Sequence, residues 1–205
     1  QVEAGRVVSV RFRNVPSFLA ERDVSVDVPE IGRVRYDLAF GGAYYAYVDA
    51  ADLELALVPA ATAEIIAAGK AIKRAVMDAS SISHPEDADL GFLYGVIFVG
   101  PSENPAHHSR NVCVFAEGEV DRCPTGTGVS GRVAIHHARG ELATGEDAVI
   151  ESLLGTTFTA RVVETVSFGP YNAVVPEVTG RAWITGQNRF TLDPSDSLVH
   201  GFLLR

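Results

Sequence analysis

The chain has 205 residues, 47% of them hydrophobic and 21% charged, and a formal net charge of −9. This composition is typical of a globular protein with a sizeable core, built as one large domain or two small ones, and it excludes extensive disorder. The only concentration of basic residues is Lys70, Lys73 and Arg74, whereas a nucleic-acid or anionic-membrane surface needs a basic patch. Neither kind of partner is expected.

The sequence also bears on localisation. It contains no apolar run long enough to span a bilayer, and no charged start followed by an apolar signal segment. Its two cysteines, Cys113 and Cys123, do not form the pattern of a disulfide framework. A cytoplasmic protein is therefore predicted. Because the chain starts at Gln1 and soon enters a strand-like pattern, we also expect it to be a piece of a longer protein.

The first half of the chain begins with strand-like alternation of apolar and polar residues. The expected strands are 6–15, 23–28, 32–40 and the aromatic-rich 43–50. A helix is predicted over 60–79, because its apolar residues gather on one face. Residues 80–89, which include Pro85 and three acidic residues, are predicted to form a loop.

The second half returns to strands, with one further helix. The expected strands are 91–100, 111–120, 156–168, 171–178 and 181–186, and Pro194 breaks the tail that follows. The second helix is predicted at 129–139, ended by Gly140. Many antiparallel-looking strands around two helices indicate the α+β class and not a βαβ alternation.

The second helix differs from an ordinary surface helix. The segment "GVSGRVAIHHARG" is small or apolar nearly all round, and a helix without a wide polar face is usually buried. Its small residues, such as Gly131, Ala134 and Ala138, suggest tight enclosure inside a curled sheet. It is preceded by "PTGTG", so several backbone N–H groups without helical partners would point toward one place, where an anion can bind.

On spacing alone, "DRCPTGTGVSG" (121–131) is compatible with a structural turn, and it matches neither the phosphate-binding loop nor the dinucleotide fingerprint. The longer stretch "VFAEGEVDRCPTGTGVSGRVAIHH" resembles the second active-site motif of the proline racemase family, normally Asp-Arg-Ser-Pro-Cys-Gly-Thr-Gly followed by a helix. "GGAYYAYVDA", "IIAAGKAIKRAV", "SHPE" and "VVPEVTGRAWITG" are also similar to that family, in the same order. The resemblance covers nearly the whole chain.

The resemblance implies a fold of two similar halves with the active site between them. Each half is a curled, mostly antiparallel sheet around a central helix, as in the diaminopimelate epimerase-like fold. The Cys-Gly-His-Gly-like motif of the first half is absent, since the only His-Gly pair is His200-Gly201 in the tail. The chain is therefore expected to be the second half, with residues 1–186 as its domain. Residues 187–205 form a tail that should return to the absent first half.

The resemblance also implies roles for particular residues. Gly126 and Thr127 would donate backbone N–H bonds to the substrate carboxylate. Asp121 would pair with the ring nitrogen of a proline-like substrate, although an exposed loop carboxylate is the alternative. Phe115 falls where the family has an aromatic pocket wall, although a strand phenylalanine packed in the core is equally compatible. The implied partner is a small molecule, proline or hydroxyproline, and a homodimer is left open.

The sequence departs from the family motif at Thr125, where racemases and epimerases carry a cysteine. A thiol with a pKa of about 8.5 serves as either base or acid near neutral pH. An alkanol hydroxyl is far too weak an acid to do so, so inversion at the α-carbon should fail or be slow. The Thr-bearing members of the family resemble trans-3-hydroxy-L-proline dehydratases, in which one base removes the α-proton and the β-hydroxyl leaves. Thr125 would then hydrogen-bond the substrate.

Two other functions remain open on the sequence. One is a proline racemase or 4-hydroxyproline 2-epimerase in which Cys123 serves as the base, and the other is a non-catalytic domain that holds a carboxylate. No set of His, Asp and Glu residues has zinc-like spacing, so no metal site is expected. The chain shows no flavin, nicotinamide or pyridoxal signature, and the resemblance implies an enzyme that works without a cofactor.

Overall fold

The computed structural model describes residues 1–202 and 204. Its helices are α1 (Thr62–Ala79) and α2 (Gly126–Ala138), with three 3₁₀ turns, η1 (Ala50–Leu53), η2 (Pro59–Ala61) and η3 (Ala88–Leu90). Its strands are β1 (Val2–Glu3), β2 (Arg6–Val7), β3 (Val10–Arg13), β4 (Phe18–Val28), β5 (Gly32–Phe40), β6 (Tyr44–Asp49), β7 (Leu93–Gly100), β8 (Ser109–Phe115), β9 (Glu119–Val120), β10 (Ala148–Glu151), β11 (Thr157–Phe168) and β12 (Tyr171–Gly180).

The strands form one large curled sheet and a small hairpin. The 10-stranded sheet has the order β3-β12-β11-β10-β8-β7-β6-β5-β4, with β9 paired to β8, and β1 and β2 form a separate two-stranded sheet. Within the large sheet only the pairs β6–β7 and β8–β10 are parallel. The α+β class and the mostly antiparallel sheet predicted from the sequence are confirmed.

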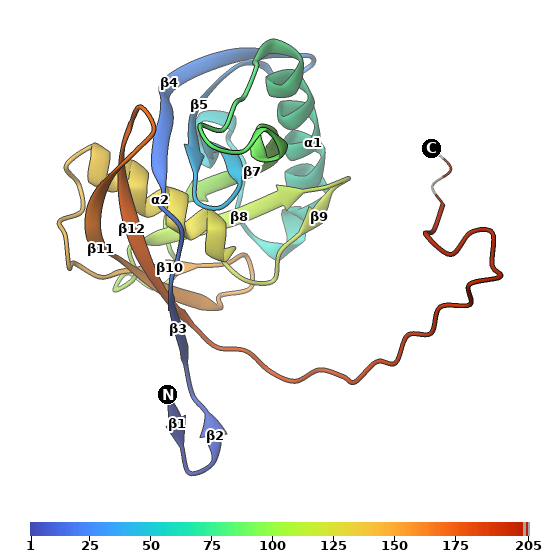
Figure 1. The fold of residues 1–205 in the computed structure, drawn as a ribbon. Helices are drawn as coiled ribbons and strands as arrows, with labels where there is room; N and C mark the ends of the chain where they lie inside the picture. Colours follow the sequence, from blue (N-terminus) through green and yellow to red (C-terminus); the bar gives the residue numbers. More distant parts are fainter. Residues whose placement is uncertain (203, 205) are drawn as a thin grey trace.

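Helix α2 lies inside the curl of this sheet. It packs against β11 and β12 on one side and against β4 and β5 on the other (Figure 1). The two ends of the strand order meet, because Ser17, just before β4, forms an antiparallel bridge with Val174 of β12. The central helix expected from the sequence is therefore confirmed.

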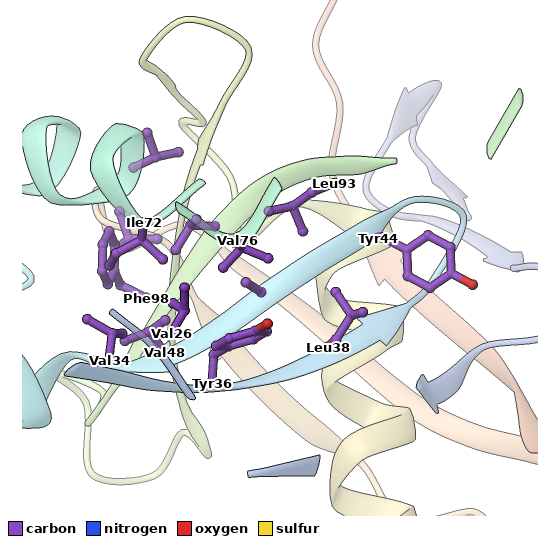
Figure 2. Close-up of a cluster of buried hydrophobic side chains, with 14 of the residues drawn as sticks. Val26, Val34, Tyr36, Leu38, Tyr44, Val48, Ile72, Val76, Leu93 and Phe98 are labelled. Atoms are coloured by element: carbon purple, nitrogen blue, oxygen red, sulfur yellow. The ribbon is translucent and has the colours of Figure 1, made fainter. Parts of the chain in front are cut away.

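The alternation of strand residues divides the core into two layers. Tyr45 and Tyr47 of β6 face α2, whereas Tyr44 and Val48 of the same strand face the layer covered by α1. Figure 2 shows that second layer, in which Ile72 of α1 packs among the side chains of the strands. Burying each large apolar side chain contributes about 1.5–3 kcal/mol, so both layers hold the sheet around α2.

Glycines let the sheet close on α2. A Cβ at Gly131 would collide with the hydroxyl of Tyr47, and a Cβ at Gly128 would collide with Ile97. The residues of α2 from Gly128 to Ile135 are all buried. The expectation of a tightly enclosed helix was correct, but the helix begins at Gly126, three residues before the predicted start at 129. The first turn forms because the Thr125 carbonyl accepts the N–H of Val129 at 2.7 Å.

The strand predictions were wrong at several boundaries. Residues 181–186 form no strand, since the chain leaves the sheet after Gly180 and Ile184 is 98% exposed. The four-residue β10 was missed because it is too short to show a period. Strand β4 starts at Phe18 instead of 23, and two β-bulges bend it. The predicted strand 6–15 is divided between β2 and β3.

Figure 1 shows the β1–β2 hairpin and the segment after β12 extending away from the body.

Candidate active site

The glycine-rich segment lies between β9 and the start of α2. The β8–β9 hairpin brings Asp121 beside β8, where its backbone N–H donates to the Cys113 carbonyl at 3.4 Å. The hydroxyl of Thr125 donates to Asp121 Oδ2 at 2.5 Å. Four of the residues singled out from the sequence, Asp121, Thr125, Gly126 and Thr127, therefore lie together at the N-terminus of a buried helix.

Thr125 has an unusual backbone conformation. Its φ is 67° and its ψ is 107°, a region that β-branched residues seldom adopt. Such strain costs about 1–3 kcal/mol and is found mostly at functional sites, where surrounding contacts enforce it. Here the enforcing contacts are the helical bond to its carbonyl and the hydroxyl bond to Asp121, and the residue is 7% exposed.

The N-terminus of α2 can receive an anion. Thr125 occupies the N-cap position, yet its side chain makes no capping hydrogen bond because its hydroxyl is directed to Asp121. The first N–H groups of a helix have no partner within the helix, and the helix dipole adds partial positive charge there. Backbone donors at Gly126 and Thr127 thus have the arrangement that binds carboxylates.

Three polar side chains that the sequence did not single out fix the beginning of α2, from Thr127 to Ser130. The hydroxyls of Tyr45 and Thr127 share a hydrogen bond of 2.7 Å, and the Tyr47 hydroxyl donates to the Gly128 carbonyl at 2.8 Å. Asn14 donates to Ser130 Oγ at 2.8 Å. The sequence did offer a signal for these contacts. Tyr45 and Tyr47 are two residues apart in one strand, so both side chains point to the same face of the sheet.

Phe115 belongs to an aromatic cluster beside the helix start. Its ring stacks on Tyr94 with centroids 5.6 Å apart, and Tyr94 meets Tyr45 edge to face, also at 5.6 Å. Phe115 is only partly buried. The cluster extends to Thr127, because Tyr45 is hydrogen-bonded to it. Phe115 is therefore linked to the start of α2 only indirectly, through Tyr94 and Tyr45. Its role as a pocket wall stays a prediction.

Both cysteines are free, and neither has an environment that favours the thiolate. Cys113 is 1% exposed, and burial raises the pKa of its thiol to about 12, so it is protonated and packs in the core. Cys123 is half-buried, and burial raises its pKa as well, although the Thr125 N–H partly offsets this by bonding to the sulfur. A raised pKa makes the thiolate, the basic form, less populated.

A buried arginine connects α2 to β8 and to the loop. Arg132 donates to Asn111 Oδ1 at 2.8 Å and to Ser109 Oγ at 3.0 Å, and Asn111 in turn donates to the Pro124 carbonyl at 3.4 Å. Burial lowers the pKa of Arg132 to about 10, which leaves it charged at neutral pH. His136 Nε2 accepts from Arg132 at 2.9 Å, so Nδ1 carries the proton and donates to Glu141 at 2.6 Å. Through Asn111, this network fixes the position of Pro124, the residue before Thr125.

The part of the chain that the structure describes forms neither a metal-binding cluster nor a membrane-spanning helix. In residues 1–202 and 204, no group of three or more His, Cys, Asp or Glu side chains could hold a metal ion. Over the same residues, no helix is long and apolar enough to cross a membrane.

Comparison with known proteins identifies the family. The model of the family described as proline racemase matches residues 1–203. A trans-3-hydroxy-L-proline dehydratase of Colwellia psychrerythraea is 50% identical over 199 residues, which are 97% of this chain and 56% of that protein. A proline racemase of Clostridioides difficile is 39% identical over 201 residues, 98% of this chain and 60% of that protein.

A solved structure agrees with these sequence relationships. The hydroxyproline epimerase of Agrobacterium vitis, crystallised with bound trans-4-OH-L-proline, matches with a TM-score of 0.90 and 33% identity. The match covers 100% of this chain and 58% of that one. The chain thus spans a little over half the length of the relatives it matches. It belongs to the proline racemase family.

Proposed function

We propose that this chain forms one wall of the active site of a cofactor-independent hydro-lyase, which converts trans-3-hydroxy-L-proline to pyrroline-2-carboxylate. The observation that carries the proposal is the position and bonding of Thr125. It stands at the helix N-terminus where the family motif has a cysteine, and its hydroxyl donates to Asp121 at 2.5 Å. The opposite wall, with the base that removes the α-proton, belongs to another part of the full-length protein.

The chemistry of Thr125 separates dehydration from inversion. Inversion needs a second acid–base group on the opposite face of the α-carbon, and the pKa of such a group must lie near the working pH. The Thr125 hydroxyl cannot meet this requirement, whereas a hydrogen bond to a hydroxylated substrate is within its chemistry. Loss of the β-hydroxyl after removal of the α-proton needs only one base.

The remaining residues have positioning roles in this proposal. The N–H groups of Gly126 and Thr127 bind the substrate carboxylate, and Asp121 binds the ring nitrogen. Phe115 contributes to the apolar wall with its stacked neighbour Tyr94. Relatives support the proposal, because a trans-3-hydroxy-L-proline dehydratase of Burkholderia ambifaria is also 45% identical over 196 residues.

We place residues 1–186 in the second half of the two-part fold and assign 187–205 to a tail that packs on the first half. The exposure of large apolar side chains supports this division. In the tail Phe190 is 89% and Leu192 78% exposed, and near the helix start Phe12 is 47% exposed. Phe12 lies close to Gly126, since a Cβ built there would meet its ring at 3.7 Å. The first half would cover these surfaces.

The direct test uses the purified full-length protein with trans-3-hydroxy-L-proline in D₂O. We expect pyrroline-2-carboxylate to form, with no inverted 3-hydroxyproline and no inversion of L-proline or 4-hydroxyproline. Deuterium incorporation with inversion and without loss of water would overturn the proposal. Absence of both reactions would instead favour a carboxylate-binding domain.

An epimerase is the second candidate, because a 3-hydroxyproline 2-epimerase of Burkholderia multivorans is 44% identical over 196 residues. In that case the half-buried Cys123 would have to serve as the second base. A Cys123→Ser variant would then lose inversion while Thr125→Ser would keep it. The raised pKa of Cys123 makes this the weaker candidate.

A further inference from the structure

Asn14 lies between β3 and β4 and contacts the beginning of α2. Its backbone N–H donates to the Pro176 carbonyl of β12 at 2.8 Å. Its side-chain Nδ2 donates to the Gly41 carbonyl at 2.9 Å and to Ser130 Oγ at 2.8 Å. Asn14 therefore joins three parts of the fold, which are β12, the turn between β5 and β6, and the beginning of α2.

The direction of these hydrogen bonds follows from the chemistry of the partners. A backbone carbonyl only accepts, so the amide of Asn14 must turn its nitrogen, and not its oxygen, toward Gly41. The second N–H of the same nitrogen is then donated to Ser130 Oγ. A hydroxyl has a single proton, and that of Ser130 is donated to the Gly126 carbonyl at 2.9 Å. A chain of donors thus runs from Asn14 through Ser130 to Gly126.

The Gly126 carbonyl shares a peptide unit with the Thr127 N–H. In a trans peptide unit, which is planar, the C=O and the N–H point in opposite directions. The Gly126 carbonyl points along α2 toward Ser130, so the Thr127 N–H points out of the N-terminal end of the helix, where the proposed substrate carboxylate binds. Glycine has more backbone freedom than any other residue. A bond that holds the Gly126 carbonyl therefore also holds this N–H donor.

The turn between β5 and β6 lies against the same part of the helix. A Cβ built on Gly41 would collide with the Thr127 carbonyl and the Gly131 nitrogen, and one built on Gly42 would meet Thr127 Cγ2 at 2.9 Å. Backbone thus lies against backbone with no side chain between them. Because Asn14 bonds to the Gly41 carbonyl, it fixes this close approach as well.

We propose that Asn14 is a positioning residue, which holds the first turn of α2 so that its N–H groups fit the substrate carboxylate. The proposal rests on the proposed function, from which it takes the carboxylate site at Gly126 and Thr127. Dehydration and inversion both bind this carboxylate, so the role of Asn14 is the same in either reaction. Asn14 acts through Ser130 and Gly41 and not by contact with the substrate.

The competing explanation is that Asn14 only stabilises the fold. Loss of folded protein lowers the concentration of active enzyme, and hence the apparent kcat, at an unchanged KM. A misplaced N–H donor instead weakens binding of the substrate and raises KM. The experiment therefore measures kcat, KM and the melting temperature of the full-length protein, with trans-3-hydroxy-L-proline as substrate.

Four single variants and one double variant separate the two explanations. Asn14→Leu keeps the shape of the side chain without its donors, and Asn14→His restores one N–H. Ser130→Ala removes the hydroxyl that links Asn14 to Gly126, and it carries the test if Asn14→Leu does not fold. The double variant combines Asn14→Leu with Ser130→Ala. Ser17→Ala is the matched control, because the buried Ser17 hydroxyl donates at 2.9 Å to the Val15 carbonyl of the same segment and not to α2.

We expect Asn14→Leu to raise KM by about 10-fold, the lower end for loss of a hydrogen bond to a charged group. Ser130→Ala should raise KM in the same direction. The double variant should be no worse than the more impaired single variant, because both changes break one chain. Asn14→His should recover part of the lost affinity. Ser17→Ala should lower the melting temperature and leave KM unchanged.

The outcomes distinguish this proposal from the proposed function. An unchanged KM in both Asn14→Leu and Ser130→Ala, an equal rise of KM in Ser17→Ala, or multiplied effects in the double variant would overturn the positioning role alone. If wild type inverts 3-hydroxyproline instead of dehydrating it, the proposed function falls, and the same KM values measured for inversion decide on Asn14. If wild type neither turns over trans-3-hydroxy-L-proline nor binds it in titration calorimetry, both proposals fall.

Discussion

The hydroxyls of Tyr45 and Thr127 lie 2.7 Å apart and share a hydrogen bond. One residue belongs to a strand of the enclosing sheet, and the other to the first turn of the enclosed helix. Burial raises the pKa of Tyr45 far above its ordinary value, so its hydroxyl stays protonated at every physiological pH. The sheet thereby fixes the orientation of the turn whose N–H groups face the proposed substrate carboxylate.

This relationship predicts the effect of Tyr45→Phe. The variant leaves the Thr127 hydroxyl without its partner, and we expect it to lower the free energy of unfolding by about 1 kcal/mol. In the full-length protein KM for the substrate should rise by a few-fold, since the loosened turn binds the carboxylate less well. Tyr94→Phe is the matched control, because Tyr94 lies in the same aromatic cluster and is partly exposed. An unchanged KM and stability for Tyr45→Phe would contradict the positioning role.

A second prediction concerns Thr125→Cys in the full-length protein. It places a thiol where the family motif has one, and a thiol is able to exchange protons near neutral pH. We expect inversion of 3-hydroxyproline or proline to appear and dehydration to fall. Because the negative charge of Asp121 lies beside that position, the thiol pKa should be raised and inversion should increase with pH. Thr125→Ser is the control, and inversion by it would show that the thiol is not the cause.

The sequence allowed the class of fold to be predicted, for a physical reason, whereas the roles of the site residues stay a prediction. The strands have the period of two that separates their faces, and α2 has small residues where the sheet approaches, such as Gly131 below the Tyr47 hydroxyl. The hydrogen bonds that orient the first turn of α2 could not be predicted. The partners Tyr45 and Thr127 are 82 residues apart, and a single sequence does not show which distant residues meet. Segment 181–186 was predicted as a strand because its alternation is real, but no neighbouring strand pairs with it among the described residues.

The acid stability of the chain should depend on Glu151. This residue is 3% exposed, and burial would raise its pKa, but hydrogen bonds from the backbone of Glu103 and Asn104 and from the side chains of His107 and Arg110 lower it to about 2. A depressed folded-state pKa contributes stability that is present above the unfolded value of 4.5 and is lost as pH falls toward 2. The full effect is about 3 kcal/mol.

The measurement is urea denaturation of this chain between pH 6 and pH 3. Wild type should lose stability steeply below pH 4.5. Glu151→Gln should be less stable by about 3 kcal/mol at pH 6, because it removes the buried carboxylate partner of Arg110 and leaves this buried guanidinium only the exposed carboxylate of Glu103. Its stability should also depend less on pH. The exposed Glu164→Gln serves as control and should behave as wild type. Parallel pH profiles for Glu151→Gln and wild type would show that this carboxylate is not responsible.

Enclosure of α2 can be tested with Gly131→Ala. The added Cβ would meet the hydroxyl of Tyr47 and the buried ring behind it, so the helix and β6 must separate. We expect a loss of about 1–3 kcal/mol or more, the usual cost of overpacking a core. Gly186→Ala adds the same atom where nothing lies within 4 Å and should leave the melting temperature unchanged. Equal melting temperatures for the two variants would contradict the close approach of helix and strand.

The last prediction concerns the 205-residue chain by itself. It should fold cooperatively, because the sheet closes on α2 and both layers of the core are complete within the described residues. It should not turn over trans-3-hydroxy-L-proline, because the proposed mechanism takes its base from a part of the protein outside these residues. It should not bind the substrate measurably either, since one exposed helix N-terminus contributes under about 1 kcal/mol, whereas millimolar binding requires roughly 4 kcal/mol. Thermal denaturation followed by circular dichroism, titration calorimetry and an assay for pyrroline-2-carboxylate check the three expectations. Turnover by the isolated chain would mean that its own residues, Cys123 first among them, supply the base.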